Sequence, residues 1–246
     1  MRWLGLMITL TILSAVATAQ SVDPLRDGEQ CLAVITESWA ATAGTAFLFE
    51  RNGRSPWQQH GSKIPVVVGK AGMAWGRGMI RTENGGGPVK REGDNRAPAG
   101  VFRLESVFGY AGTSPATKMP YLPLTTSILA VNDPRSVHYN RLVDTSQIHD
   151  RDWSTAEKMI LSDNRYKWGV VVAHNVPPRP GAGSCIFLHV WKSPSTPTSG
   201  CTAMTEHDLL SIIRWLDPAR TPLLVQLPRS GYDTLRAKHE LPSLPR

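Results

Sequence analysis

The segment GSCIFLHVWKSPSTPTSGCTAM, residues 183–204, decides most of what the sequence indicates about the fold. Its first part, Ile186–Trp191, is rich in apolar and aromatic residues and predicts a β-strand. A loop rich in proline and serine follows, and residues 198–201 (TSGC) then lie just before a predicted helix. A strand, a loop and a helix therefore follow one another, with His189 at the end of the strand and Cys201 before the helix.

The helix that follows Cys201 has the clearest helical signal in the chain. Thr205 is a good N-cap with Asp208 three residues later, and Asp217-Pro218 ends the pattern. Apolar residues recur between these points at helical spacing, namely Leu209, Ile212, Ile213 and Leu216. We expect this apolar stripe to pack on a sheet. Two weaker helices are predicted at Ser154–Leu161, from a capping box of Ser154 and Glu157, and at Tyr232–His239.

Short strands bounded by glycine, proline, asparagine or aspartate are spread along the rest of the chain. The predicted strands are Cys31–Thr36, Thr45–Glu50, Ile64–Gly69, Gly100–Leu104, Ser127–Val131, Trp168–Ala173, Ile186–Trp191 and Leu223–Leu227. With few helices beside them, these strands predict a mainly β fold, a mostly antiparallel β-sandwich with a few peripheral α-helices.

Length and composition indicate one globular domain. The 246 residues are 41% hydrophobic and 19% charged, with 21 glycines and 19 prolines, which excludes collagen-like, coiled-coil and mostly disordered chains. No internal repeat, low-complexity tract or long linker divides the chain. We expect a catalytic domain over residues 31–228, preceded by a short lead-in at 20–30 and followed by a helix and tail at 229–246 that pack on the same domain.

The first residues predict export. Arg2 is followed by the apolar stretch Trp3–Leu13 and then by Ala17-Thr18-Ala19, which is the pattern of a secretory signal peptide over residues 1–19. The apolar stretch is too short to span a bilayer core of about 30 Å. We therefore expect a periplasmic or extracellular protein without a stable membrane anchor.

The charge pattern and the absence of known cofactor-binding motifs argue against several classes of function. The net charge of +7 is diffuse, with no long run of lysine and arginine, and gives no support for nucleic-acid binding. The chain has no phosphate-binding loop, dinucleotide fingerprint or His-Glu-x-x-His motif, and its histidines and cysteines lack a recognised zinc spacing. We expect a monomer that needs neither metal nor organic cofactor.

Cys201 is the candidate nucleophile. The chain has three cysteines, and an odd number in an exported protein leaves one thiol over. A cysteine acts as its thiolate, so it needs a nearby base, cation or helix N-terminus, and His189 and the following helix offer these. Gly200 permits a tight turn, and the backbone amides of Gly200 and Cys201 are candidates for an oxyanion hole beside Ser199. Cys185 is either a buried residue or paired with Cys31 in a disulfide.

The pattern resembles the L,D-transpeptidase catalytic-domain family (YkuD-type). The likeness rests on Ile186-Phe187-Leu188-His189, on Ser199-Gly200-Cys201-Thr202-Ala203-Met204, and on residues 93–102 (GDNRAPAGVF), which resemble the Thr-Pro-x-Gly-x-Phe strand entry of that family. The resemblance implies that Cys201 forms a thioester with a peptidoglycan stem peptide, that His189 accepts and donates the proton, and that a second stem resolves the thioester into a cross-link.

This chain departs from the family pattern near the nucleophile. Thr-Ser-Gly-Cys replaces Ser-His-Gly-Cys, so Ser199 stands in place of the family histidine, and Ala203 stands in place of the arginine that usually follows the cysteine. Other polar groups must then bind the substrate. The candidates are His174, Asn175, Trp191 and Tyr139.

Two alternative functions remain open. With water as acceptor, the same thioester would make the protein an L,D-carboxypeptidase, an endopeptidase or an amidase, because the shape and dryness of the cleft choose the acceptor. A non-catalytic cell-wall-binding module is favoured if Cys201 is tied in a disulfide or is inaccessible.

Overall fold

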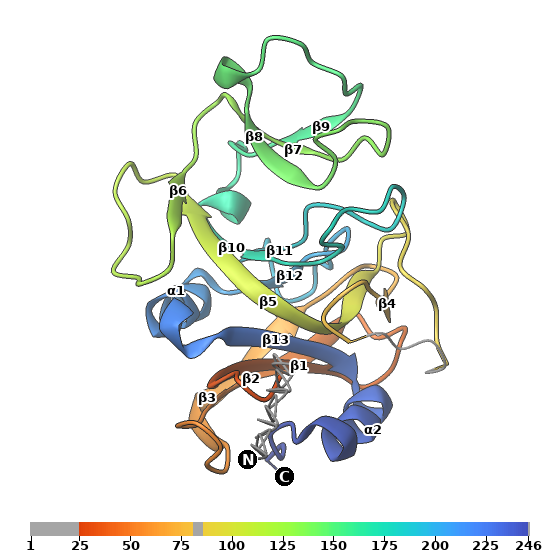
Figure 1. Ribbon diagram of the computed structural model, residues 1–246, viewed down its shortest axis with the longest axis vertical. Helices are drawn as coiled ribbons and strands as arrows, with labels where there is room; N and C mark the ends of the chain where they lie inside the picture. The colour runs from red at the N-terminus through yellow and green to blue at the C-terminus, as the bar shows by residue number, and fades with distance from the viewer. Residues whose placement is uncertain (1–24, 81–85, 246) are drawn as a thin grey trace, which may run out of the picture.

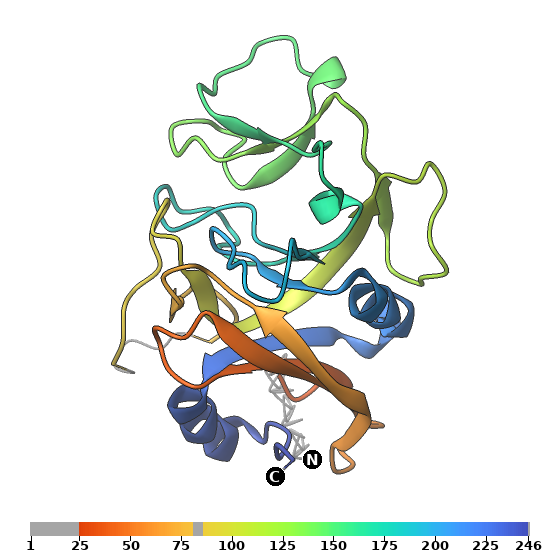
Figure 2. The same cartoon turned by 180° about the vertical axis from the view of Figure 1, so that it is seen from behind.

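The computed structural model describes residues 25–80 and 86–245. The predicted signal peptide at 1–19 and the beginning of the lead-in lie outside these residues. Within the described residues, no helix is long and apolar enough to cross a membrane. The fold is mainly β, as predicted, and the two α-helices lie on different sides of the molecule (Figures 1 and 2).

The main sheet closes on itself. Its strands follow the order β10-β11-β12-β3-β2-β1-β13-β5, and β5 then pairs with β10 to complete a ring. The strands of this ring are β1 (Gln30–Thr36), β2 (Ala43–Glu50), β3 (Gln58–Val67), β5 (Ala97–Gly109), β10 (Trp168–Val172), β11 (Phe187–Val190), β12 (Thr202–Met204) and β13 (Pro222–Pro228). Two short strands, β4 (Met73–Trp75) and β6 (Tyr121–Pro123), pair with β5 outside this ring.

The expected sandwich is therefore corrected to a closed barrel. The physical reason is the length of β5, which has 13 residues where the sequence predicted only Gly100–Leu104. Residues Gly100–Arg103 pair with β13, and Leu104–Gly109 pair with β10. The predicted part of the strand is the part that pairs with β13, and the unpredicted part closes the ring. Most pairings are antiparallel, as expected, but β1 with β13, β11 with β12, and β5 with both β4 and β6 are parallel.

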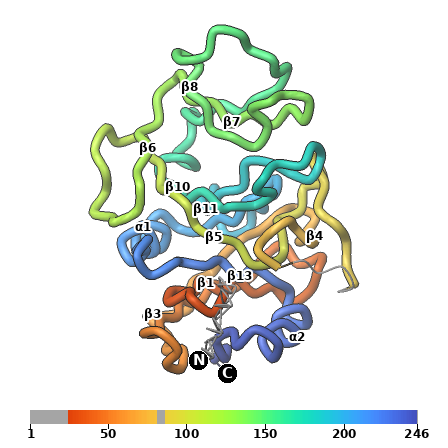
Figure 3. The backbone as a smooth tube through the Cα atoms, viewed as in Figure 1, coloured from red at the N-terminus to blue at the C-terminus, as the bar shows by residue number. Residues whose placement is uncertain are grey.

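A smaller sheet is inserted between β5 and β10. It consists of β7 (Ile128–Val131) between β8 (Arg141–Asp144) and β9 (Ala156–Lys158), and it stands at the end of the molecule opposite the C-terminus (Figure 3). The helix predicted at Ser154–Leu161 is wrong, because its residues form β9 and irregular chain. The side chains of the supposed capping box bind elsewhere: the Ser154 hydroxyl donates to Asp133, and Glu157 accepts the hydroxyl of Tyr166.

The helix predicted after Thr205 and the helix predicted at Tyr232–His239 are both present. The first, α1 (Glu206–Trp215), is capped by the Thr205 side chain, which accepts the Asp208 amide hydrogen, and it packs against β10 and β11. The second, α2 (Arg229–His239), begins earlier than predicted and packs against β13 and β1. Short 3-10 helices occur at Thr145–Gln147, Asn164–Tyr166 and Pro218–Arg220.

A buried amide joins three strands of the barrel. Gln226, in β13, has no exposed surface; its side-chain amide donates to the Pro98 carbonyl in β5 at 2.8 Å, and its oxygen accepts the Thr202 hydroxyl in β12. Buried polar groups must be paired, because losing a partner costs their full desolvation. Since Thr202 directly follows Cys201, this bridge also anchors the loop that carries the candidate nucleophile.

We predict that Gln226→Ala lowers the free energy of unfolding by about 2–3 kcal/mol, because two buried partners lose their hydrogen bonds and a cavity forms. Chemical denaturation followed by circular dichroism measures this loss. The control is Gln147→Ala at an exposed position, for which we expect a change within about 0.5 kcal/mol. Equal stability of the two variants would show that the Gln226 bridge does not hold the barrel.

Candidate active site

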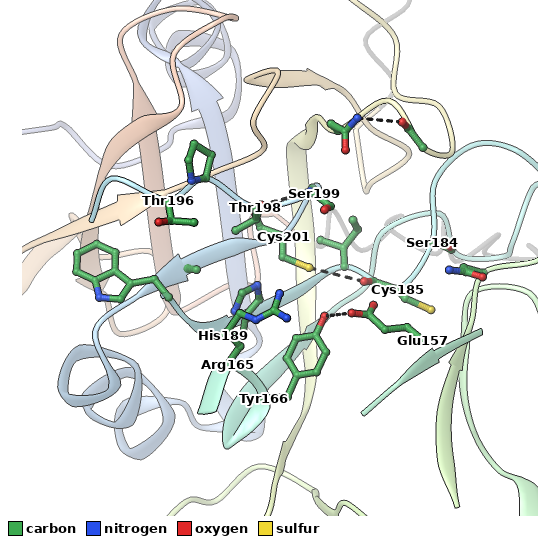
Figure 4. A pocket seen from close by; sticks show the side chains of 18 of the residues that line it. Glu157, Arg165, Tyr166, Ser184, Cys185, His189, Thr196, Thr198, Ser199 and Cys201 are labelled. Atoms are coloured by element: carbon green, nitrogen blue, oxygen red, sulfur yellow. Dashed lines mark hydrogen bonds between the residues drawn. The ribbon is translucent and has the colours of Figure 1, made fainter. Parts of the chain in front are cut away.

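A cavity of about 360 Å³ lies at the ends of β11 and β12 (Figure 4). Its lining comes mainly from the loop before β5, the segment between β9 and β10, both ends of β11, and the loop that leads into β12. It contains the sequence-predicted residues His189, Cys201, Ser199, Gly200 and Trp191. The structure therefore brings both candidate catalytic residues into one cavity.

Parallel pairing of β11 with β12 brings His189, in β11, close to the start of β12. Leu188 is opposite Thr202, and His189 is opposite Ala203. Cys201 directly precedes β12, and the Phe187 amide donates a hydrogen bond to its sulfur at 3.3 Å. After β11, the connection formed by residues 191–201 leads the chain back so that β12 lies next to β11.

Thr198 fixes the turn that carries the nucleophile. Its hydroxyl donates to the Cys201 carbonyl at 2.6 Å and accepts the Gly200 amide hydrogen at 3.1 Å. Its backbone is tied to the end of β3, because its amide donates to the Val68 carbonyl and its own carbonyl accepts from Lys70. The turn therefore has little freedom to move the thiol. Thr198 was seen in the sequence only as part of the TSGC motif.

Gly200 is required by the shape of this turn. Its φ is +153°, and a side-chain carbon there would lie 3.1 Å from the Arg96 carbonyl oxygen. Its amide already donates to Thr198, so it reaches an oxyanion only by giving up that hydrogen bond. Of the two predicted oxyanion donors, the Cys201 amide is therefore the better placed.

The environment of His189 makes it a neutral base. The ring is buried, its Nδ1 lies 2.8 Å from the Val190 carbonyl oxygen, and the Tyr166 ring packs edge-on against it with centroids 5.3 Å apart. Because a carbonyl only accepts hydrogen bonds, Nδ1 carries the proton and Nε2 is left as the basic nitrogen. Burial lowers the pKa of His189 to about 4, so the imidazole is uncharged near neutral pH.

Cys201 is a protonated thiol in the unliganded protein. Burial raises its pKa to about 12, an effect that the hydrogen bond from the Phe187 amide opposes. The thiol points to the Cys185 carbonyl oxygen, 3.8 Å away (Figure 4). Cys201 and His189 therefore form a neutral pair, and the proton has to leave the sulfur during the reaction rather than before it.

The match to known proteins agrees with this geometry. The model of the L,D-transpeptidase catalytic domain, YkuD, matches residues 42–225, which include the barrel from β2 almost to the end of β13. The chain belongs to this family. A search of the curated proteins finds no match.

The other two cysteines are free thiols in this L,D-transpeptidase domain. Cys31 is buried in β1, so the alternative of a disulfide between Cys31 and Cys185 is not formed. The strand predicted at Ile186–Trp191 begins at Phe187, so Cys185 lies before it and has a φ of +52°. Cys185 lines the cavity beside Cys201, and its amide donates to Asn140.

His174 and Asn175 lie outside the cavity lining. His174 is buried, its Nε2 lies 3.0 Å from the Ala182 carbonyl oxygen, and burial lowers its pKa to about 4. The Asn175 side chain donates to the Gly183 carbonyl. The Asn140 side chain donates to the backbone carbonyls of His174 and Asn175. These contacts brace the loop before β11, so both residues act on the site by positioning backbone.

Tyr139 also lies behind the cavity wall. Its hydroxyl donates to the Glu92 carboxylate, which accepts a second hydrogen bond from Ser184 at 2.8 Å. Glu92 and Ser184 line the cavity, whereas Tyr139 does not. Of the four predicted substrate-binding residues, Trp191 alone is part of the lining.

The sequence analysis missed three lining residues that come from the inserted segment. Glu157 is in β9, and Arg165 and Tyr166 are in the 3-10 helix before β10. Tyr166 packs against His189 and Phe187, and its hydroxyl donates to Glu157 at 2.8 Å. No motif marks these residues, because only the path of the inserted segment brings them over the cavity. Among the described residues, no group of histidine, cysteine, aspartate and glutamate is arranged to hold a metal ion.

We predict that alkylation of Cys201 by iodoacetamide accelerates about tenfold per pH unit between pH 7 and 10, without a plateau, because the thiolate fraction keeps rising below a pKa of about 12. Peptide mapping by mass spectrometry separates Cys201 from Cys31 and Cys185, and circular dichroism checks that the fold persists. A plateau near pH 7 would instead show a preformed thiolate paired with an imidazolium.

Proposed function

We propose that this protein is a cysteine acyltransferase that forms peptidoglycan cross-links, an L,D-transpeptidase that acts in the periplasm or outside the cell. The supporting observation is that Cys201 and a neutral His189 line the same cavity, in a chain of the L,D-transpeptidase family. Export rests on the sequence pattern of residues 1–19. The monomeric state is a further expectation.

In the first step, the sulfur of Cys201 attacks the carbonyl carbon at the L-centre of a diamino acid in a tetrapeptide stem. His189 Nε2 accepts the thiol proton as the C–S bond forms, and the resulting imidazolium then protonates the leaving amine as the C–N bond breaks. The products are a thioester and free D-alanine. The amide of Cys201 is the candidate donor to the developing oxyanion, because the Gly200 amide already donates to Thr198.

In the second step, the amine of another stem attacks the thioester. His189 accepts a proton from the attacking nitrogen, the new C–N bond forms, and the C–S bond breaks. The departing sulfur recovers a proton from the imidazolium, so the neutral pair is restored. The Val190 carbonyl holds the imidazole in one tautomer throughout this cycle, which keeps Nε2 available in both steps.

A binding-only function has less support. It was favoured on the condition that Cys201 is tied in a disulfide or inaccessible, whereas the thiol is free and half-buried at the cavity. Hydrolysis uses the same acyl-enzyme and differs only in the acceptor. The reaction products therefore decide between these functions.

We predict that the mature protein, incubated with purified disaccharide-tetrapeptides, produces cross-linked dimers that have lost one D-alanine, and that Cys201→Ala produces none. Mass spectrometry of the products and of the intact protein detects both the dimers and the thioester. The control is Cys31→Ala, which removes a thiol from the barrel core and should keep the activity at some cost in stability.

Trimmed monomers that depend on Cys201 would identify a hydrolase in place of a transpeptidase. The absence of any product that depends on Cys201 would contradict the proposed acyl transfer.

We predict that His189→Gln lowers turnover by about 10²–10⁴-fold, because no other base on β11 takes the thiol proton. The protein should remain folded, since glutamine fills a similar volume. The matched control is His149→Gln at an exposed position, with an expected rate close to that of the parent. Thioester formation measured by intact-protein mass spectrometry isolates the first step; an unchanged rate in His189→Gln would assign the base to another group.

A further inference from the structure

Two opposite charges face the thiol from the inserted segment. Glu157 arrives on β9 and Arg165 on the 3-10 helix Asn164–Tyr166, and both line the cavity together with Cys201 and His189 (Figure 4). They come from the side of the cavity opposite the nucleophile turn. The proposed acyl-transfer chemistry gives neither of them a role.

Glu157 has unused hydrogen-bonding capacity. One carboxylate oxygen accepts the Tyr166 hydroxyl at 2.8 Å, and among the described residues no hydrogen bond reaches the other oxygen. Burial raises the pKa of this carboxyl, whereas the Tyr166 hydroxyl and the charge of Arg165 act in the opposite direction. A half-buried carboxylate with one free oxygen favours a cationic partner.

Arg165 also keeps donors available. Its Nε lies 2.9 Å from both carboxylate oxygens of Asp163, which fixes the side chain, and no contact within the described part of the chain uses its terminal amino groups. Arg165 and Glu157 do not form an ion pair with each other. A fixed guanidinium with two free amino groups is suited to a carboxylate.

The other charged residues of the lining are engaged or open to solvent. Lys90 is buried and paired with Asp94, and Glu92 accepts hydroxyls from Tyr139 and Ser184. Lys192 is half-exposed and lies 3.7 Å from Asp163. Glu157 and Arg165 combine opposite charges with hydrogen-bonding atoms that stay available for a ligand, and both come from the inserted segment.

We propose that Glu157 and Arg165 form a subsite for an α-amino acid group, in which an ammonium and a carboxylate are carried by one carbon. Glu157 binds the ammonium, and Arg165 binds the carboxylate. A plain amine would leave the terminal amino groups of Arg165 without an acceptor, although Nε stays bound to Asp163, and a plain carboxylate would meet the negative charge of Glu157. The inference rests on the proposed function for the identity of the substrate, a stem peptide whose diamino acid ends in such a group.

The same chemistry is present in two sources. One is the side-chain end of the diamino acid in a stem peptide, and the other is a free amino acid such as the released D-alanine. We commit to the stem peptide, because a side-chain group bound here would hold the reacting carbonyl beside Cys201, in the same cavity.

The test is a binding measurement on Cys201→Ala, which separates recognition from turnover. Isothermal titration calorimetry compares tetrapeptide stems that contain diaminopimelate, whose side chain ends in an amino acid group, with stems that contain lysine, whose side chain ends in an amine. We expect the diaminopimelate stem to bind at least about tenfold more tightly, which corresponds to about 1.4 kcal/mol. Added Glu157→Gln, which keeps an oxygen for Tyr166, or Arg165→Gln should each abolish this preference.

Lys158→Gln is the matched control, because it removes a charge from the exposed residue next to Glu157. It should leave the preference unchanged. Acidification should weaken binding of the diaminopimelate stem as Glu157 takes up a proton, and Glu157→Gln should lack this pH dependence. Such a profile would not follow from a merely structural role of Glu157.

Equal affinity for the two stems, no binding of either stem, or tight binding of free D-alanine without a preference between stems would each overturn this assignment. Turnover of the same stems by the parent protein is measured separately. If the preference for the diaminopimelate stem is present but no stem is turned over, the proposed function is contradicted and the subsite is supported. If the stems are turned over without a preference, the subsite is contradicted and the proposed function is supported.

Discussion

The structure depends on one strand that pairs with two parts of the barrel. The first half of β5 pairs with β13 and its second half pairs with β10, so β5 closes the ring between the N-terminal strands and the strands of the site, which also meet where β3 pairs with β12. The two backbones approach closely because Gly109 and Gly169 leave room for the rings of Trp168 and Phe108; a side-chain carbon on either glycine would lie within 2.6 Å of an aromatic atom. Once this pairing forms, β10 positions β11, and β11 positions β12 with its nucleophile turn.

The site is built from two parts of the chain, the barrel and the segment inserted between β5 and β10. The barrel wall carries His189 in β11 and Cys201 directly before β12, and the register of these two paired strands sets their relative position. The chain between β5 and β10 leaves the barrel, builds the small sheet, and returns with Glu157, Arg165 and Tyr166. The candidate nucleophile and base thus come from the barrel, whereas the residues of the proposed amino acid subsite come from the insertion.

Local signals predicted what local interactions determine. The cap at Thr205 and the apolar stripe of α1 follow from spacing alone, and the short connection between His189 and Cys201 placed both residues on one corner of the fold. Closure of the barrel depends on pairing between β5 and β10, which are far apart in sequence, and no local pattern reports it. Ser154 and Glu157 match a capping box, yet Asp133 and Tyr166 offer them tertiary partners that override it. Arg165 could not be predicted from the sequence either, because only the tertiary structure places it at the cavity.

Burial keeps the candidate catalytic residues His189 and Cys201 uncharged in the absence of a substrate. His189 is oriented by a backbone carbonyl, and no carboxylate hydrogen-bonds to its ring in the described part of the chain. An imidazolium there would be a buried cation on whose pKa the nearby charges of Arg165 and Asp163 act in opposite directions, and a thiolate at Cys201 would likewise need a compensating charge. The barrel therefore holds the pair uncharged, and separating the charges becomes favourable only when a substrate carbonyl accepts the sulfur and its oxygen meets the Cys201 amide. A thiol that stays protonated until a substrate binds is slow to be alkylated or oxidised, because both reactions require the thiolate.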